Sequence, residues 1–226
     1  MKNTILRHSP AITFSVMAVF VLVAIDHLFL RLCGMQLPYP VALLSLASLL
    51  VCPFSATLFF LFSALGDWGG ATGQFLPQMA AFATAHVLLI YYLATPFGKT
   101  KSAFAHIYQT KRATLLASVC FCLGLLVIVF GHIVPKVPEG VLTIGVSVYA
   151  LLIVSMWFLS LWNPSAWIKI GSTLFLISDF ILAWNKFVEP LDNARLLILV
   201  PYFAAQVLLF AGIAIHRHKQ LTNKNK

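Results

Sequence analysis

Residues 140–161 read GVLTIGVSVYALLIVSMWFLSL, and no acidic or basic side chain interrupts them. The apolar residues are continuous and do not alternate, which favours a helix over a barrel strand. A helix needs about 20 such residues to cross the hydrocarbon core of a bilayer. The segment therefore predicts a transmembrane helix, and runs of the same kind recur along the chain.

The composition of the whole chain supports the same interpretation. Of 226 residues, 61% are hydrophobic and only 9% are charged, whereas soluble domains have about 45–50% apolar and about 25% charged residues. A soluble core could not hide this much apolar surface. In lipid, unpaired backbone groups cost several kcal/mol, so the spans must be helices or a closed barrel. Continuous apolar runs favour helices.

We therefore expect an all-α, polytopic membrane bundle of about eight transmembrane helices, forming a single domain over residues 1–226. The second and third spans are short, and they could instead form one broken hairpin around Pro53. Short connections predict that successive helices are antiparallel neighbours. The expected spans are 11–33, 39–53, 55–68, 76–96, 113–134, 140–161, 165–184 and 195–215.

The positive residues predict the orientation of this bundle. Lys and Arg are enriched in short cytoplasmic loops, and with eight spans ten of them lie on the side of both termini and four on the other. The larger group includes Lys99, Lys101, Lys111 and Arg112, together with a short basic tail at about 216–226. Both termini are thus expected in the cytoplasm, and in a bacterium the membrane would be the inner one. Because the charges are scattered, no nucleic-acid partner is expected.

Acidic residues are rare in this chain, and half of them lie in or beside apolar segments. Only six Asp and Glu residues are present, and Asp26, Asp67 and Asp179 fall within or at the edges of the expected spans. An ionisable side chain inside a membrane is costly and marks a candidate functional site. All three come late in spans expected to run outward, so they lie at a similar depth in the outer half of the bilayer.

Polar residues from the inward-running spans reach that same depth. His86 lies near the middle of the fourth span, and Tyr202 and Gln206 lie in the outer part of the eighth. This convergence predicts a polar cavity that opens toward the non-cytoplasmic leaflet. Each residue also has a structural interpretation, because polar side chains often join membrane helices by hydrogen bonds. Asp26 with His27 could likewise be a structural pair.

A pair of buried carboxyl groups can divide the roles of general acid and general base. Carboxylates with a histidine can also bind metal, but the sequence has no His-x-x-x-His or His-Glu-x-x-His pattern. No metal or cofactor is therefore expected. Gly-x-Ser-x-Gly is absent too, which disfavours a serine nucleophile. A proton-coupled lipid or small-molecule carrier stays open, since carboxylate relays occur in transporters, although no inverted repeat is evident.

Four elements in order resemble one known family. They are LGD at 65–67, FATAH at 82–86, GSTLFLISDFILAWNKF at 171–187 and YFAAQVL at 202–208. With eight spans and this length, they resemble the YhhN/TMEM86 family of lysoplasmalogenases, integral membrane hydrolases of ether-lipid metabolism. The resemblance implies hydrolysis of the vinyl ether bond of lysoplasmalogen, which releases a fatty aldehyde and glycerophospho-ethanolamine or -choline.

The resemblance also implies roles for particular residues. The proposed catalytic aspartates of the family match Asp67 and Asp179, and we expect Asp179 as the acid and Asp67 as the base, with the reverse assignment open. Two positions depart from the family: Leu37 stands where relatives often carry lysine, and Leu89 where they often carry tyrosine. Lys186 and Arg195 could meet the phosphate at the outer mouth. The candidate substrate-binding or orienting residues are Asp26, His86, Ser178, Asn185, Lys186, Tyr202 and Gln206.

The expected partners are a lysophospholipid substrate and the bilayer itself, and the oligomeric state is left open. Two other classes remain beside the hydrolase: the proton-coupled carrier, and a non-catalytic membrane protein that kept the fold.

Overall fold

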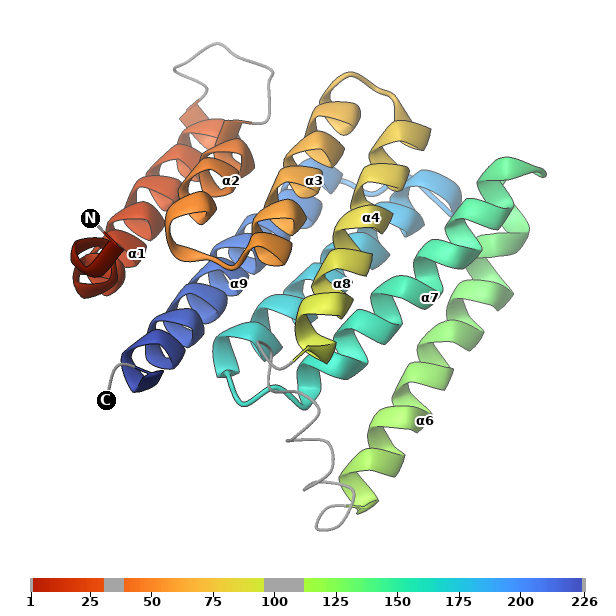
Figure 1. The fold of residues 1–226 in the computed structure, drawn as a ribbon. Helices are drawn as coiled ribbons and strands as arrows, with labels where there is room; N and C mark the ends of the chain where they lie inside the picture. Colours follow the sequence, from red (N-terminus) through yellow and green to blue (C-terminus); the bar gives the residue numbers. More distant parts are fainter. Residues whose placement is uncertain (1, 31–38, 96–111, 225–226) are drawn as a thin grey trace.

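The computed structural model describes residues 2–30, 39–95 and 112–224, and the elements in these ranges are all helical (Figure 1). This confirms the all-α class, and eight α-helices of 13 residues or more lie in these ranges. They are α1 (Lys2–Ile25), α2 (Tyr39–Val51), α3 (Phe54–Ala71), α4 (Phe75–Ala94), α6 (Arg112–Ile128), α7 (Val141–Leu161), α8 (Ala166–Phe187) and α9 (Ala194–Lys224).

Two of these helices change their winding at one end. The π-helical turn η1 (Asp26–Leu30) follows α1. The π-helical turn η2 (Val129–Ile133) and the 3-10 turn η3 (Val134–Lys136) follow α6. π-Turns of this kind often occur at functional sites, and η1 contributes to the cavity described below.

Six of the described helical segments are long and apolar enough to cross a bilayer, which makes the chain a multi-pass integral membrane protein. The remaining two, α2 and α3, are the expected short pair, with 13 and 18 residues. They are separate helices that pack on each other, and Pro53 stands immediately before α3. Proline suits that position because it lacks the N–H that a first helical turn leaves unpaired.

The last helix is longer than the sequence suggested. The eighth span was expected to end at 215 and give way to a basic tail, but α9 continues to Lys224. The added turns contain good helix formers such as Lys, Arg and Gln. Within them, the side chains of Gln220 and His216 are 2.8 Å apart, and Thr222 bonds the carbonyl oxygen of His218 at 2.9 Å. The tail is therefore helical in this part.

The two most extensive helix pairs are α8 with α9 and α3 with α4, and they frame the centre of the bundle (Figure 1). Glycines allow the close approach. A Cβ on Gly171 of α8 would lie 3.1 Å from the carbonyl oxygen of Ala205 on α9, and one on Gly69 of α3 would lie 2.9 Å from the backbone nitrogen of Gln78 on α4. Small residues at such contacts are typical of helix packing in membranes.

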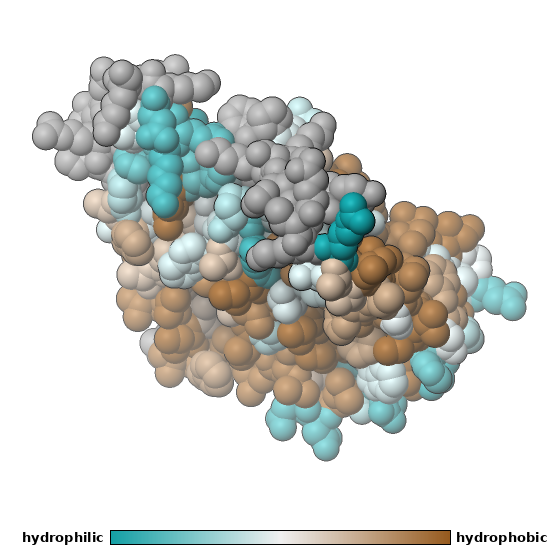
Figure 2. Space-filling model, turned by 90° about the horizontal axis from the view of Figure 1, so that it is seen from below, coloured by the Kyte–Doolittle hydropathy of each residue, from teal (hydrophilic) through white to brown (hydrophobic). Residues whose placement is uncertain are grey.

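The outside of the bundle is apolar. Helix α6 stands at one edge against α7 (Figure 1), and of its side chains only Cys122 is buried. Large side chains such as Leu116 and Val127 are largely exposed. Viewed from below, hydrophobic residues cover much of the surface that is not drawn in grey (Figure 2). Such an apolar surface is compatible with contact to the hydrocarbon chains of lipids.

Both ends of the chain lie at the same end of the bundle (Figure 1). An even number of spans requires this arrangement. Which side of the membrane that end faces stays a prediction, and Lys99, Lys101 and Lys111, on which it partly rests, lie outside the described residues.

Candidate active site

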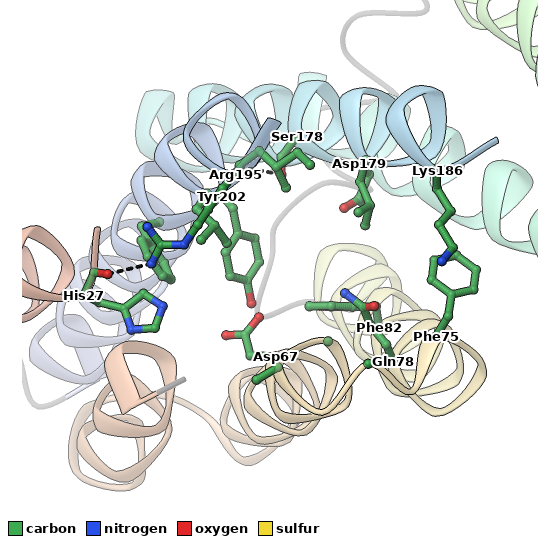
Figure 3. Close-up of a pocket in the computed structure, with 17 residues that line it drawn as sticks. His27, Asp67, Phe75, Gln78, Phe82, Ser178, Asp179, Lys186, Arg195 and Tyr202 are labelled. Atoms are coloured by element: carbon green, nitrogen blue, oxygen red, sulfur yellow. Dashed lines mark hydrogen bonds between the residues drawn. The ribbon is translucent and has the colours of Figure 1, made fainter. Parts of the chain in front are cut away.

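A cavity of about 730 Å³ lies at the opposite end of the bundle, among the ends of α3, α4, α8, α9 and η1 (Figure 3). Six residues predicted to belong to the site line it. Asp67 comes from α3, and Arg195 and Tyr202 come from α9. The other three lie on α8: Ser178, Asp179 and Lys186.

The two aspartates enter this cavity from different walls. Asp67 and Asp179 are far apart in the chain, yet both side chains point into the same space (Figure 3). The ring of Phe82 on α4 forms part of the wall. It packs directly on Gly66, where a Cβ would lie 2.8 Å from the ring. Glycine beside Asp67 is therefore needed to seat this ring.

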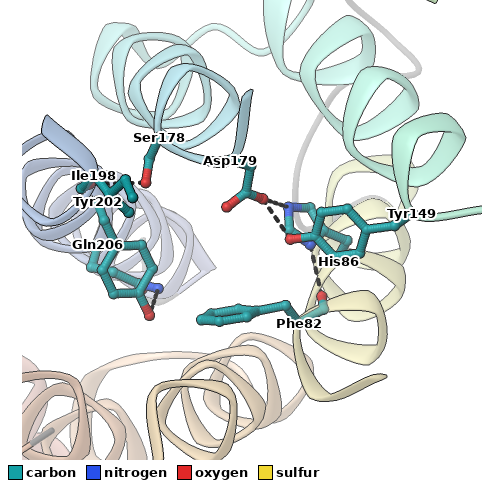
Figure 4. Close-up of polar contacts among 8 residues, drawn as sticks. All are labelled: Phe82, His86, Tyr149, Ser178, Asp179, Ile198, Tyr202 and Gln206. Carbon is teal, nitrogen blue, oxygen red and sulfur yellow. Dashed lines mark hydrogen bonds and ion pairs between the residues drawn. The ribbon is translucent and has the colours of Figure 1, made fainter. Parts of the chain in front are cut away.

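Asp179 is held by two side chains from other helices (Figure 4). The hydroxyl of Tyr149 on α7 donates a hydrogen bond of 2.5 Å to its Oδ2. The Nε2 atom of His86 on α4 lies 3.9 Å from the same oxygen, and the Asp179 side chain is only 9% exposed. The ring of His86 also packs edge-on against that of Tyr149. The carboxyl group is thus fixed in position, with its other oxygen left for the cavity.

The tautomer of His86 follows from its other contact. Nδ1 lies 2.7 Å from the carbonyl oxygen of Phe82, which can only accept, so Nδ1 carries hydrogen. In a neutral ring Nε2 is then an acceptor, and it is buried without a hydrogen-bond partner. Two acceptors turned toward each other would repel. At 3.9 Å the two atoms are not hydrogen-bonded, and a proton on either the imidazole or the carboxyl group would remove this repulsion.

Asp67 has a different environment. Its Oδ2 is buried and has no hydrogen-bond partner within the described chain, and leaving such a group unpaired costs about 1–3 kcal/mol. The hydroxyl of Tyr202 points toward this carboxyl group (Figure 3). Gln206 donates to the oxygen of Tyr202 at 3.0 Å, so the hydroxyl hydrogen stays free to be donated. Asp67 is therefore the less satisfied carboxyl of the two.

His86 and Gln206 are fully buried behind the cavity wall. His86 reaches the site through Asp179, and Gln206 reaches it through Tyr202. Ser178 lines the cavity, but its hydroxyl donates to the carbonyl oxygen of Ile198 at 2.9 Å and ties α8 to α9. These three side chains therefore position other residues of the site and are less available for direct contact with a ligand.

Asp26 and Asn185, two expected site residues, do not line the cavity. Asp26 accepts a hydrogen bond of 2.5 Å from Tyr39. Its neighbour His27 lines the cavity instead. Asn185 accepts a hydrogen bond of 2.8 Å from the backbone of Leu191, which shapes the connection between α8 and α9. The position of a residue along its helix predicts its depth in the membrane, but it does not predict whether the side chain faces the cavity.

The two basic residues at the mouth also differ in their surroundings. Arg195 lines the cavity, but its guanidinium donates to the carbonyl oxygens of His27 at 2.7 Å and Leu28 at 2.9 Å. It fastens α9 to η1. Lys186 is exposed at the rim, with its Nζ 5.4 Å from the centre of the Phe75 ring. Lys186 is therefore the cation better placed to meet a ligand.

Two residues at the site, Tyr149 and Gln78, were not predicted from the sequence, and His27 was considered only as a structural partner of Asp26. Gln78 and His27 line the cavity, and Tyr149 holds Asp179. One signal was available, because Tyr149 is the single tyrosine within the apolar run at 140–161. Of the family departures, Leu89 is fully buried in the core, and Leu37 lies outside the described residues.

The donor set does not suggest a metal centre. Within the described part of the chain, no three His, Cys, Asp or Glu residues are grouped closely enough to hold an ion. What the site offers is two carboxyl groups, a buried histidine and two tyrosine hydroxyls beside an amphipathic cavity. This arrangement suits proton transfer to and from a lipid-like molecule.

Comparison with known proteins gives a consistent set of relatives. The model of the YhhN family matches residues 38–213. Lysoplasmalogenase TMEM86B of Homo sapiens is 33% identical over 154 residues, which are 65% of this chain and 58% of that protein. The Mus musculus protein of the same name is 35% identical over 153 residues, covering 65% and 58%. Lysoplasmalogenase TMEM86A of Bos taurus is 28% identical over 184 residues, covering 73% and 68%.

The chain thus spans less than two thirds of the length of the TMEM86B proteins that it matches. No solved structure gives a significant match.

Proposed function

The chain belongs to the YhhN family, as its motifs predict, and from this membership and the chemistry of its cavity we propose that it is a lysoplasmalogenase-like membrane hydrolase. The observation that carries the proposal is that Asp67 and Asp179, from distant parts of the chain, point into one cavity. The substrate would be lysoplasmalogen, and the products would be a fatty aldehyde and glycerophospho-ethanolamine or -choline. Residues 1–226 would act as one integral-membrane domain.

The reaction begins with general acid catalysis. Asp179 gives its proton to the β-carbon of the vinyl ether, which turns the α-carbon and the ether oxygen into an oxocarbenium ion. The carboxylate of Asp67 stabilises this positive charge across the cavity. Proton transfer by a positioned side chain contributes about 10²–10⁴-fold to a rate.

Water completes the reaction. A water molecule adds to the α-carbon while Asp67 accepts its proton, which gives a hemiacetal. The hemiacetal hydroxyl group then loses its proton, the bond between the α-carbon and the ether oxygen breaks, and the glycerol oxygen takes up a proton as the aldehyde forms and leaves. The proton taken up by Asp67 balances the proton that Asp179 gave, so the site returns to its starting state through solvent exchange.

The neighbours of Asp179 have defined tasks in this scheme. Tyr149 donates to one carboxyl oxygen and so turns the other toward the cavity. His86 favours the protonated form of Asp179, since its Nε2 faces that carboxyl group at 3.9 Å. Tyr202 donates to Asp67 or to an oxygen of the substrate. At the rim, Lys186 meets the phosphate of the headgroup.

The deciding experiment uses purified protein in detergent and measures aldehyde released from lysoplasmalogen. We expect the native protein to release aldehyde, and Asp179→Asn to lose at least about 10²-fold in rate while it still inserts and purifies. Asp67→Asn should lose activity as well. Full activity of Asp179→Asn would refute the acid assignment. Absence of aldehyde with the native protein, together with proton-dependent lysolipid uptake into sealed vesicles, would favour the carrier.

A second test asks whether the reaction requires a metal ion. Activity should survive exhaustive chelation, because the scheme needs only side chains and water. Loss of activity on chelation, with rescue by Zn²⁺, would contradict it.

A further inference from the structure

Asp179 lies where two hollows of different chemistry meet. Beside the large cavity, a second one of about 50 Å³ lies among α4, α7 and α8. Asp179, Phe82 and Leu182 belong to the walls of both. The carboxyl group therefore borders the two spaces at once.

The two spaces differ in what lines them. The large cavity has Asp67, Tyr202 and Lys186 in its walls. The small one is walled mainly by hydrocarbon, from Met79, Val146, Ala183 and Phe187. Val146 is buried, and Phe187 packs in the same apolar cluster. An amphipathic molecule would thus meet polar groups on one side of Asp179 and apolar groups on the other.

A vinyl ether lipid has this division of polarity. The ether joins a polar glycerol headgroup to an apolar chain, and the carbon that takes the proton lies on the chain side. We propose that the small cavity is the start of a passage that takes the alkenyl chain, with the headgroup in the large cavity. This inference rests on the proposed function and specifies where its substrate lies.

Met79 lines the small cavity where α4 packs on α7. It is only partly buried, and it packs so closely on α7 that a Cβ on Gly145 would lie 2.3 Å from its terminal methyl carbon. The small cavity holds only the beginning of a long chain, so the rest would pass Met79 toward the lipid between α4 and α7. Methionine suits this place because its unbranched side chain rearranges easily.

The test compares substrates with short and long alkenyl chains. Val146→Phe narrows the passage, and we expect it to lower kcat/KM for the long chain by about tenfold relative to the short one, because apolar pockets discriminate single methylenes by about 10–200-fold. Val146→Ala should instead raise kcat/KM for the long chain relative to the short one. Val148→Phe is the matched control, since Val148 lies on the same helix and is half exposed, and it should leave the ratio unchanged.

A measurement on the native protein does not depend on how these variants fold. A non-hydrolysable alkyl ether analogue with a photoreactive group in its chain should label Met79 or Val146 on α4 and α7. Labelling confined to α6, or to the α3 and α9 walls of the large cavity, would overturn the passage.

The activity results separate the two proposals. If the native protein releases aldehyde but the long-to-short ratio is the same in Val146→Phe and Val146→Ala as in the native protein, the passage is refuted and the hydrolase stands. If the native protein releases no aldehyde from any substrate, the hydrolase is refuted and the passage falls with it.

Discussion

At the scale of single residues, the site depends on how Asp179 is held. Tyr149 provides a hydrogen bond of 2.5 Å to one carboxyl oxygen, and its ring packs on His86. Tyr149→Phe removes the bond and keeps the ring. Asp179 becomes a carboxylate as it gives up its proton, and a hydrogen bond to a charged group contributes about 1.5–3 kcal/mol, so we expect kcat to fall about 10–100-fold with KM nearly unchanged.

The control for this prediction is Tyr91→Phe on α4. Tyr91 is 61% exposed on the outside of the bundle, so its hydroxyl should not affect the reaction. Steady-state kinetics and the pH profile of kcat/KM are measured for both variants. A Tyr149→Phe variant that loses thermal stability but keeps native kinetics and the native pH profile would show a structural role only.

Lys186 gives a second prediction at this scale. As an exposed cation at the rim it should attract the substrate phosphate, and exposed ion pairs contribute about 0.2–1 kcal/mol. Lys186→Gln should therefore raise KM by up to about fivefold at low salt, with kcat unchanged. Lys219→Gln, an exposed lysine near the terminal end of α9 and away from the cavity, is the control. An alkenylglycerol without phosphate should be insensitive to both changes; equal KM shifts for it and the phospholipid would contradict the assignment.

The site residues that could be predicted from the sequence are those whose side chains are unfavourable to insert into a bilayer. A carboxyl group within a membrane span indicates a functional site, and this rule identified Asp67 and Asp179 as candidates. Tyr149 and Gln78 were missed because tyrosine and glutamine are tolerated at many membrane positions. Whether such a side chain faces the cavity depends on the rotation of its helix about the helix axis, which is set by tertiary packing.

At the scale of elements, the lengths of helices were easier to predict than their contacts. The fourth and sixth expected spans, 76–96 and 140–161, match α4 and α7 within two residues at each end. Bilayer thickness sets these lengths. The π-helical turns and the long α9 could not be predicted, because they depend on tertiary contacts and on side-chain bonds beyond the apolar run.

Helix contacts can be tested through Gly66, which seats the Phe82 ring beside Asp67. Gly66→Ala should push that ring and lower both thermal stability and activity, because overpacking a core costs about 1–3 kcal/mol. Gly124→Ala in α6 is the matched control, since nothing lies within 4 Å of the added methyl group. Alanine favours helices over glycine by about 1 kcal/mol, so this control should be neutral or stabilising. Equal thermal stability and activity in the two variants would contradict the packing argument.

At the scale of the whole molecule, the position of the cavity predicts from which side of the membrane a ligand enters. The cavity lies near the point where α3 ends and α4 and α9 begin, at the end of the bundle opposite the chain termini (Figure 1). The distribution of Lys and Arg predicts that the termini are cytoplasmic. Substrate would then enter from the non-cytoplasmic leaflet, with its chain in lipid and its phosphate near Lys186.

This orientation is tested with single cysteines in a background without native cysteine. Asn223→Cys lies at the terminal end of α9, and Asp192→Cys lies in the exposed connection between α8 and α9 at the cavity end. In intact cells, a thiol reagent that cannot cross the membrane should label Asp192→Cys, and it should label Asn223→Cys only after the cells are opened. The reverse pattern would invert the bundle and place both the cavity and lipid entry in the cytoplasmic leaflet. Labelling of both cysteines in intact cells would be incompatible with a bundle that keeps its ends on opposite sides.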